Sequence, residues 1–199
     1  NLIPLMPDET IRAVIPIRTF APDRCLLMGT RHGVVKKTAL PDFDTKRKGG
    51  LVAIRLDPDD DLVSVKPTTG NQDVIIATAQ GKALRFNERD VRSMGRNTRG
   101  VRGIDLAKGD TVIGMDVVKE DRDFLVVTEN GFGKRTPLDQ YRTYSRARKG
   151  VRTIGLTDKS GLAVAVKVLD GDDELMCISA EGIIIRMDVA DIPQQGRAA

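Results

Sequence analysis

Residues 74–85, Val-Ile-Ile-Ala-Thr-Ala-Gln-Gly-Lys-Ala-Leu-Arg, hold the pattern that decides the fold. An apolar, β-prone stretch leads to a hydroxyl residue, two further residues and a glycine, and a basic side chain follows four positions after the glycine. A glycine at this place supplies the positive φ that a tight hairpin turn requires. The stretch therefore predicts two antiparallel strands joined by a short turn.

The same pattern occurs four times along the chain. Its glycines are 48, 50 and 51 residues apart: Gly33, Gly81, Gly131 and Gly182. The hydroxyl residue three positions earlier is Thr30, Thr78, Thr128 or Ser179, and the basic residue four positions later is Lys37, Arg85, Arg135 or Arg186. Repeats of this length are typical of propeller blades rather than of helical solenoids.

Each repeat continues into a second half that is built on another glycine. The stretches concerned are Gly50–Leu56, Gly100–Leu106 and Gly150–Leu156. Their apolar residues alternate with period two, which predicts strands with one buried face. An acidic or glycine-bearing turn and a further apolar stretch follow, so that each repeat is expected to contain about four strands.

We therefore expect an all-β, propeller-like domain over residues 1–199, built of repeats of 48–51 residues. The approximate repeats are 1–15, 16–66, 67–117, 118–168 and 169–199. The first and the last of them hold only part of the pattern. This predicts that the sequence is a piece of a larger array of repeats.

The charges follow the repeat, although the whole chain carries a formal net charge of only +4. Three stretches have net charges of +5, +5 and +6: 31–55, 82–102 and 132–152. The three stretches between them have a net charge of −4 each: 56–81, 103–131 and 153–182. If the repeats are arranged around a ring, equivalent loops point the same way, and the basic loops form one continuous edge.

A repeated basic edge predicts binding to a polyanion. Lys and Arg side chains neutralise phosphates and release counterions, which gives binding with little dependence on base sequence. The chain has no Trp, two Tyr and five Phe, too few for a reader of stacked single-stranded bases. We expect the edge to bind and bend double-stranded DNA through Lys36, Lys37, Lys46, Arg47, Lys48, Arg85, Arg92, Arg96, Arg99, Arg102, Lys134, Arg135, Arg142, Arg146, Arg148, Lys149 and Arg152.

No pattern in the sequence predicts catalysis, a cofactor or a metal site. Gly133-Lys134 lacks the glycine five residues earlier and the following Ser or Thr of a phosphate-binding loop, and His32 has no paired carboxylate or thiol in sequence. Cys25 and Cys177 stand alone in apolar runs, without the spacing of metal ligands. The alternative to DNA binding is a propeller that docks another protein.

Nothing in the sequence resembles a signal peptide, and no apolar run approaches the roughly 18 residues of a membrane span. We therefore expect a soluble, cytoplasmic protein.

Several stretches resemble one known family, the C-terminal domain of the A subunit of bacterial DNA gyrase, with the corresponding domain of topoisomerase IV as a close relative. They are residues 31–38, 81–88, 94–103 and 128–138. The resemblance implies a β-pinwheel, a propeller-like ring of about six blades that exchange strands with their neighbours. It also implies that DNA wraps around a basic outer rim and that this wrapping supports negative supercoiling.

The same resemblance implies the context of the domain. The parent enzyme is an ATP-dependent type II topoisomerase whose catalytic tyrosine, ATP and Mg²⁺ lie in other parts. Its partners are gyrase B and the N-terminal domain of gyrase A in an A2B2 assembly, and the isolated piece is expected to be a monomer associated with the bacterial nucleoid. Tyr141 and Tyr144 are the only tyrosines, and neither is expected to cleave DNA.

The sequence departs from the family in one motif. The signature heptapeptide Gln-Arg-Arg-Gly-Gly-Lys-Gly, which the family uses for chiral wrapping, does not occur intact. Degenerate echoes of it stand at 46–50 and at 145–150. We therefore expect this chain to bind DNA without supporting supercoiling by itself.

Overall fold

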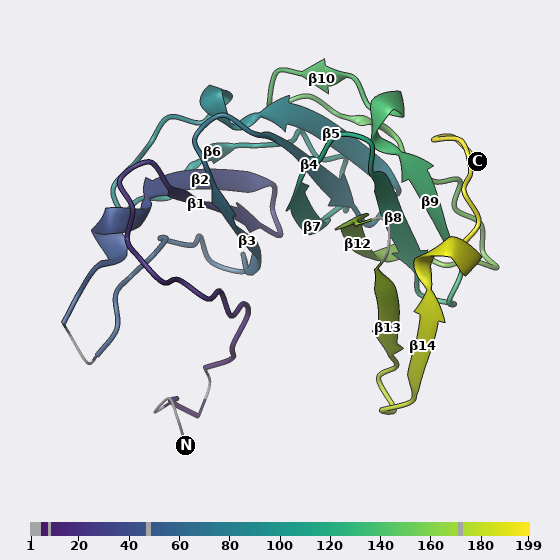
Figure 1. Cartoon of the computed structure of the whole chain (residues 1–199), viewed down its shortest axis with the longest axis horizontal. Coiled ribbons are helices and arrows are strands. Elements are labelled where there is room, and N and C mark those ends of the chain that lie inside the picture. Colours follow the sequence, from purple (N-terminus) through teal and green to yellow (C-terminus); the bar gives the residue numbers. More distant parts are fainter. Residues whose placement is uncertain (1–4, 8, 47–48, 171–172) are drawn as a thin grey trace.

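The chain forms a row of small β-sheets that follow one another around an arch (Figure 1). The computed structural model describes residues 5–7, 9–46, 49–170 and 173–199. Every helix in this part of the chain is a single 3-10 turn: η1 (Leu40–Phe43), η2 (Glu88–Asp90), η3 (Leu138–Gln140) and η4 (Val189–Asp191). The all-β fold class is confirmed.

Four hairpins are the centres of the sheets. They join β1 (Cys25–Thr30) to β2 (Val34–Ala39), β4 (Asp73–Thr78) to β5 (Lys82–Asn87), β8 (Asp123–Thr128) to β9 (Gly133–Pro137), and β13 (Glu174–Ile178) to β14 (Ile184–Asp188). The four repeat glycines have φ of +81°, +74°, +79° and +82° in chain order. Each glycine amide donates to the carbonyl oxygen of the hydroxyl residue three positions earlier, at 3.0 Å. The predicted hairpin turns are confirmed.

A further strand lines the inner side of each of the first three sheets. These strands are β3 (Leu62–Thr68), β7 (Val112–Val117) and β12 (Ala163–Leu169). They pair antiparallel with β1, β4 and β8, respectively. Because β7 contacts both β3 and β12, the inner strands hold neighbouring sheets together inside the arch (Figure 1).

The outermost strands come from the following repeat. β6 (Val101–Arg102) pairs with β2, while β10 (Thr143–Tyr144) and β11 (Val151–Arg152) both pair with β5. Two isolated parallel bridges, Lys37 with Ser93 and Arg135 with Gln194, repeat the contact that β10 makes. The first two sheets are thus completed by strands of the next repeat, and an isolated bridge continues the pattern at the third. This is the strand exchange of a β-pinwheel.

The second-half strands are shorter than the sequence predicts. Alternation over 100–106 and 150–156 predicts full strands, but only Val101–Arg102 and Val151–Arg152 are strands, and 50–56 contains none. The reason is local. After two residues the chain leaves the edge of β2 and crosses the hairpin, where the Gly103 amide donates to the Gly33 carbonyl at 2.7 Å. The apolar alternation instead places Ile104 over that turn.

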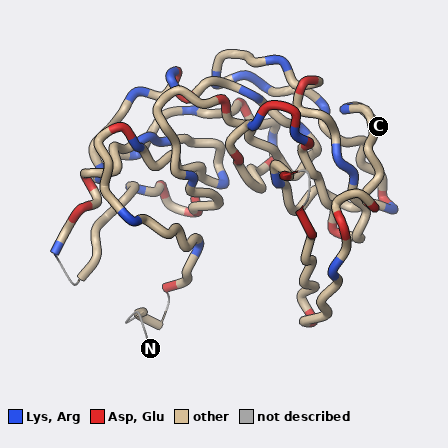
Figure 2. Tube along the Cα trace, in the orientation of Figure 1, with Lys and Arg blue, Asp and Glu red and all other residues tan. Residues whose placement is uncertain are grey.

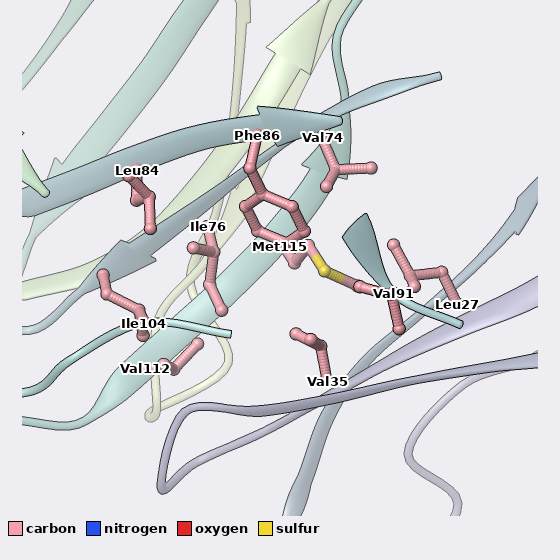
Figure 3. Packing of buried hydrophobic residues seen from close by; sticks show 10 residues of the cluster. All are labelled: Leu27, Val35, Val74, Ile76, Leu84, Phe86, Val91, Ile104, Val112 and Met115. Atoms are coloured by element: carbon pink, nitrogen blue, oxygen red, sulfur yellow. The ribbon is translucent and has the colours of Figure 1, made fainter. Parts of the chain in front are cut away.

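The hydrophobic core lies between sheets rather than within one. One cluster draws on two consecutive repeats (Figure 3): Leu27, Val35, Val74, Ile76, Leu84, Phe86, Val91, Ile104, Val112 and Met115. A second cluster joins the next pair of sheets around Phe124, Tyr141 and Ile154, and the rings of Phe124 and Tyr141 meet edge to face at 5.7 Å. A single repeat cannot bury its apolar face alone, so the repeats are stable only together.

The sheet at the C-terminal end of the arch differs from the others. β13 and β14 pair only with each other in the described part of the chain, and their hairpin exposes Met176, Ile178 and residues 183–185. Each of these side chains is more than half exposed, between 53% and 65%. The apolar alternation that is buried in the other hairpins is thus open to solvent here.

The strand exchange brings Gly150 so close to the preceding sheet that there is no room for a side chain, and this can be tested. This residue has φ +71°, and a Cβ would lie 2.6 Å from the Ala83 carbonyl oxygen of the preceding sheet. Gly109 has a similar φ of +77° and open space around it. We expect Gly109→Ala to cost about 1–2 kcal/mol of unfolding free energy from the left-handed backbone alone. Gly150→Ala should lower the free energy of unfolding, measured in urea, clearly more than Gly109→Ala does. Equal losses for the two variants would contradict the close contact between Gly150 and Ala83.

Candidate nucleic-acid interface

The basic residues of the repeat divide into two groups by burial. In the first three hairpins, those that follow the glycine by three or four positions are buried or half-buried: Lys36, Lys37, Arg85, Lys134 and Arg135. Arg186 of the fourth hairpin is exposed. Those in the later loops of each repeat are mostly exposed. The sequence predicts both groups as DNA-binding residues, but the structure gives them different surroundings.

Arg85 and Arg135 are clamps between sheets. The Arg85 Nε donates to the Asp73 carboxylate at 2.8 Å, and its Nη1 reaches the carbonyl oxygens of Leu138 and Tyr141 at 3.2 and 3.3 Å. Arg135 repeats the arrangement, with Asp123 at 2.6 Å and the Ile192 carbonyl at 2.8 Å. In both cases the carbonyls belong to the 3-10 turn region of the next repeat. The guanidinium is therefore committed to holding two repeats together.

The first repeat makes the same clamp with different residues. Cys25 stands where Asp73 stands in the second repeat, so Lys37 has no carboxylate in its own hairpin. The Lys37 Nζ instead donates to the Glu88 carbonyl at 2.7 Å and lies 4.0 Å from the buried Glu88 carboxylate. That carboxylate also accepts from Thr68 and from the Gln72 amide. A buried lysine and a buried glutamate thus join β2 to η2.

Two further lysines are buried with backbone partners. The Lys36 Nζ donates to the Ala53 carbonyl at 2.6 Å and to the Arg96 carbonyl, and the Lys134 Nζ donates to the Gly196 carbonyl at 2.6 Å and the Arg197 carbonyl at 3.1 Å. Desolvation lowers the pKa of Lys36 to about 8, with a further contribution from the charge of Arg96. Burial likewise lowers the pKa of Lys134.

Five residues of the predicted interface are engaged in contacts inside the protein. The residues Lys36, Lys37 and Lys134 are 0%, 7% and 2% exposed, and their ammonium groups are hydrogen-bonded inside the protein. Arg85 and Arg135 are half-buried, with their guanidinium groups bound to carboxylates and carbonyls. Reaching a phosphate would break those bonds and leave buried acceptors unpaired. The five residues are therefore structural in this conformation.

The exposed cations gather in two equivalent loops. We call residues 92–102, which include β6, and residues 142–152, which include β10 and β11, the outer loops, because they run along the convex edge of the arch (Figures 1 and 2). The two loops carry basic residues at the same four positions, 50 residues apart: Arg92 and Arg142, Arg96 and Arg146, Arg99 and Lys149, Arg102 and Arg152. Repetition of structure thus places matching charges side by side along one edge.

Most of these cations are free to meet a ligand. Arg92, Arg142, Arg148, Lys149 and Arg152 are exposed, and no ion pair involves them in the described part of the chain. Two others have weak partners. Arg99 pairs with Asp57 at 2.8 Å and Arg102 with Asp105 at 3.6 Å, yet their side chains remain 66% and 68% exposed. Exposed pairs of this kind contribute about 0–1 kcal/mol, so a phosphate can replace the carboxylate.

The remaining predicted positions have other surroundings. Arg146 is half-buried, and its guanidinium donates to the carbonyls of Asp90 and Arg102 at 2.9 and 2.8 Å. It therefore attaches the outer loop 142–152 to the preceding repeat. Arg96 is also half-buried. Lys46 is exposed in the corresponding part of the first repeat. Arg47 and Lys48 lie outside the described residues.

Two exposed cations near the outer loops were not among the residues predicted to bind DNA. Lys82 is paired with Arg152 in the register of β5 and β11, so the two side chains are neighbours on the outer edge. Arg89 is exposed on η2, three residues before the outer loop. Both lie in the basic stretch 82–102, and that stretch-level charge is the signal that could have included them.

The described residues contain no group of three His, Cys, Asp or Glu side chains that could hold a metal ion. Tyr141 is buried, and its hydroxyl hydrogen-bonds the Thr153 hydroxyl at 2.5 Å, whereas Tyr144 is exposed on β10. His32 is also exposed, with Nδ1 3.8 Å from an Asp60 oxygen. Across the described ranges, no helix has the length and apolarity needed to cross a membrane.

A family model agrees with this arrangement over nearly the whole chain. The model for the DNA gyrase C-terminal domain, beta-propeller, matches residues 26–69, 72–119, 122–170 and 173–199. The chain belongs to this family. Its four matched segments each contain one of the hairpins described above. The resemblance predicted from the loop motifs is thus confirmed.

Relatives and solved structures give the same result. The gyrase A protein of Staphylococcus epidermidis is 43% identical over the whole chain, and that of Staphylococcus aureus is 42% identical. The chain spans 23% of the length of these curated relatives. A crystal structure of the C-terminal domain of DNA topoisomerase IV matches with a TM-score of 0.92 at 30% identity, covering all of this chain and 62% of that one. A structure of the DNA gyrase A C-terminal domain matches at 0.89 and 30%, covering 99% and 67%. The β-pinwheel fold of the chain is that of these neighbours.

The clamp between repeats can be tested at Arg85. Burial raises the pKa of Asp73, but hydrogen bonds from Thr143, Asn87 and Arg85, together with the charge of Arg85, bring it below its ordinary value. A depressed carboxyl pKa adds stability above the unfolded pKa of 3.8 and loses it as pH falls through the folded pKa. Arg85→Met should therefore cost about 2 kcal/mol in urea unfolding at pH 7, because the pair is only partly buried.

The difference between wild type and Arg85→Met should shrink as the pH is lowered from 7 to about 2.5, because protonation of Asp73 ends the ion pair in the wild type. A pH-independent difference would show that the Asp73 pair contributes nothing and that packing alone explains the loss.

Proposed function

We propose that this domain binds double-stranded DNA along its outer loops without base specificity and bends the duplex around the convex edge. The observation that supports this most directly is the recurrence of four basic positions in two consecutive outer loops, most of them exposed. A charge pattern repeated at the period of the fold produces a stripe, whereas scattered solubilising charges would not align.

Phosphates are the chemical partner that this stripe fits. Most of its cations are arginines, whose planar guanidinium groups match phosphate oxygens in a bidentate manner. The outer loops contain no Phe or Trp, and their one aromatic residue with an exposed ring is Tyr144. Stacking on splayed bases therefore has little support, and contacts to the backbone of a duplex remain.

The curvature of the edge accounts for the bending. Figure 2 shows that the edge is curved. A duplex that bends around this edge would contact more of the basic stripe than a straight duplex would. Bending a 20–30 base-pair duplex by 40–90° costs of the order of 1–6 kcal/mol. Additional phosphate contacts at the second loop offset this cost, as they do in architectural proteins that deform DNA without reading bases.

The wider role follows from the family and is likewise a proposal. Within gyrase A, the domain would wrap DNA for an ATP-dependent type II topoisomerase, together with gyrase B and the N-terminal domain of gyrase A in an A2B2 enzyme of the bacterial cytoplasm. Catalysis, ATP and Mg²⁺ would belong to those other parts. Since no intact heptapeptide occurs in this sequence, wrapping by this chain alone is not expected to support supercoiling.

Two other assignments make different predictions. A topoisomerase IV domain would also bind DNA but would serve substrate selection, and the structural match at TM-score 0.92 keeps it as an alternative. A protein-docking propeller would use a surface other than the outer loops, and its binding to duplex DNA would be absent at low salt. A duplex titration separates this last assignment from the first two.

The test removes two exposed cations at equivalent positions. In the double variant Arg102→Gln/Arg152→Gln, duplex affinity should fall for all base sequences alike. The slope of log K against log salt concentration should lose about 0.9 for each lost phosphate contact, or about 1.8 in total. Fluorescence anisotropy with labelled duplexes of about 40 base pairs and two compositions measures both quantities.

The matched control is Lys108→Gln/Lys167→Gln, which removes the same charge from exposed lysines outside the outer loops. Its salt slope should stay at the wild-type value. Equal slopes for the two double variants, or a loss on one base composition only, would contradict the proposal. Ligation of linear duplexes into small circles measures the bend, and an unchanged rate of circularisation on adding wild-type protein would argue against bending.

A further inference from the structure

The buried ammonium group of Lys36 donates hydrogen bonds to backbone carbonyls of two different repeats. Its ammonium group is completely buried in β2 and bridges two carbonyls, one from Ala53 and one from Arg96. Ala53 belongs to the second half of the same repeat, whereas Arg96 lies in the outer loop of the next repeat. One lysine side chain thus links two segments that are far apart in sequence.

Lys134 makes the equivalent contact two repeats later. Its Nζ donates to the carbonyls of Gly196 and Arg197, and Arg197 corresponds by repeat spacing to Arg96. In the repeat between them, the equivalent position is Leu84, which is buried in an apolar cluster and cannot donate a hydrogen bond. The outer loop there is held instead by the guanidinium of Arg146, bound to the Asp90 and Arg102 carbonyls.

The outer loop 92–102 depends on a small number of other bonds. The Met94 amide donates to the Lys37 carbonyl at 2.8 Å, and the Thr98 carbonyl accepts from the Arg55 amide at 2.9 Å. Between these two attachments the chain bears Arg96 and leads to Arg99. The Lys36 ammonium holds the middle of this interval. Its removal would leave the Arg96 carbonyl with only the Thr98 amide of its own loop, at 2.9 Å, and would break this link between the loop and β2.

We propose that Lys36 is a positioning residue for DNA binding, which fixes the outer loop 92–102 through the Arg96 carbonyl so that the exposed arginines are in place before the duplex arrives. The proposal rests on the proposed function of the outer loops. Its physical basis is entropy: a loop that is ordered in the free protein does not lose backbone and side-chain freedom when it binds. Lys36 itself contacts no phosphate in this arrangement.

The test replaces Lys36 with the residue that the chain uses at the equivalent position of the next repeat. In Lys36→Leu, hydrogen–deuterium exchange of residues 94–99 should become faster, while exchange in β4 and β8 stays slow. Duplex affinity should fall roughly tenfold, which is about the entropic cost of ordering the backbone of one residue. The salt slope should remain at the wild-type value, since the number of phosphate contacts is unchanged.

The measurements separate the possible roles. If the slope of log K against log salt concentration falls by about 0.9, Lys36 contacts a phosphate. If the folded variant binds duplex as tightly as the wild type, the hydrogen bond from Lys36 to Arg96 serves stability only. Either result overturns the proposal. Lys134→Leu is the matched control: it removes the same kind of bond from residues 193–199, which carry Arg197, and should lower duplex affinity less than about twofold.

A failure to fold and a failure to bind have separate controls. If Lys36→Leu does not fold, Lys36→Met keeps the length of the side chain, and the same affinity and slope decide the question. If the wild type itself fails to bind duplex, the proposed function fails, whereas unchanged exchange of 94–99 in a variant whose parent binds duplex counts against the positioning role alone.

Discussion

The structure depends on a cation in each of the first three hairpins that holds the carbonyls of the next repeat. Arg85 and Arg135 reach the 3-10 turn region of the following repeat while paired with an aspartate of their own hairpin, and Lys37 does so through Glu88. With the exchanged strands β6, β10 and β11, this clamp sets the position of each sheet relative to its neighbour. The clamp also positions the outer loops relative to each other, because each outer loop begins directly after a clamped 3-10 turn.

The hairpin skeleton was predictable from sequence because its determinants are local. A glycine at positive φ, a hydroxyl residue and two apolar stretches specify a turn and two strands without reference to the rest of the chain. Strand exchange is different in kind, because it joins residues such as Val35 and Val101 that are 66 positions apart. Nothing in the alternation of 100–106 shows that its partner strand lies in the preceding repeat, so its predicted length was wrong.

DNA binding by the basic edge stays a prediction, and charge alone does not distinguish a clamp from a ligand contact. A pairing signal was present: an acidic residue stands 12 positions before the cation in three repeats, as Asp73 before Arg85, Asp123 before Arg135 and Glu174 before Arg186. In these hairpins two residues 12 apart are diagonal neighbours on adjacent strands, as Asp73 lies opposite Asn87 and Arg85 opposite Ile75. The cation is therefore neutralised within its own sheet. Burial of Lys36 and Lys134 had no such signal, since their partners are backbone carbonyls of distant segments.

Lysine footprinting with and without duplex tests the division between structural and DNA-facing cations most directly. Brief acetylation of the free protein, read by mass spectrometry, should modify the exposed Lys46, Lys108, Lys149 and Lys167 and spare the buried Lys36 and Lys134. A saturating duplex of about 40 base pairs at low salt should protect Lys149 and leave Lys108 and Lys167 reactive. Equal protection of all exposed lysines, or protection of Lys108 and Lys167 with Lys149 still reactive, would contradict the assignment of the outer loops as the DNA-binding surface.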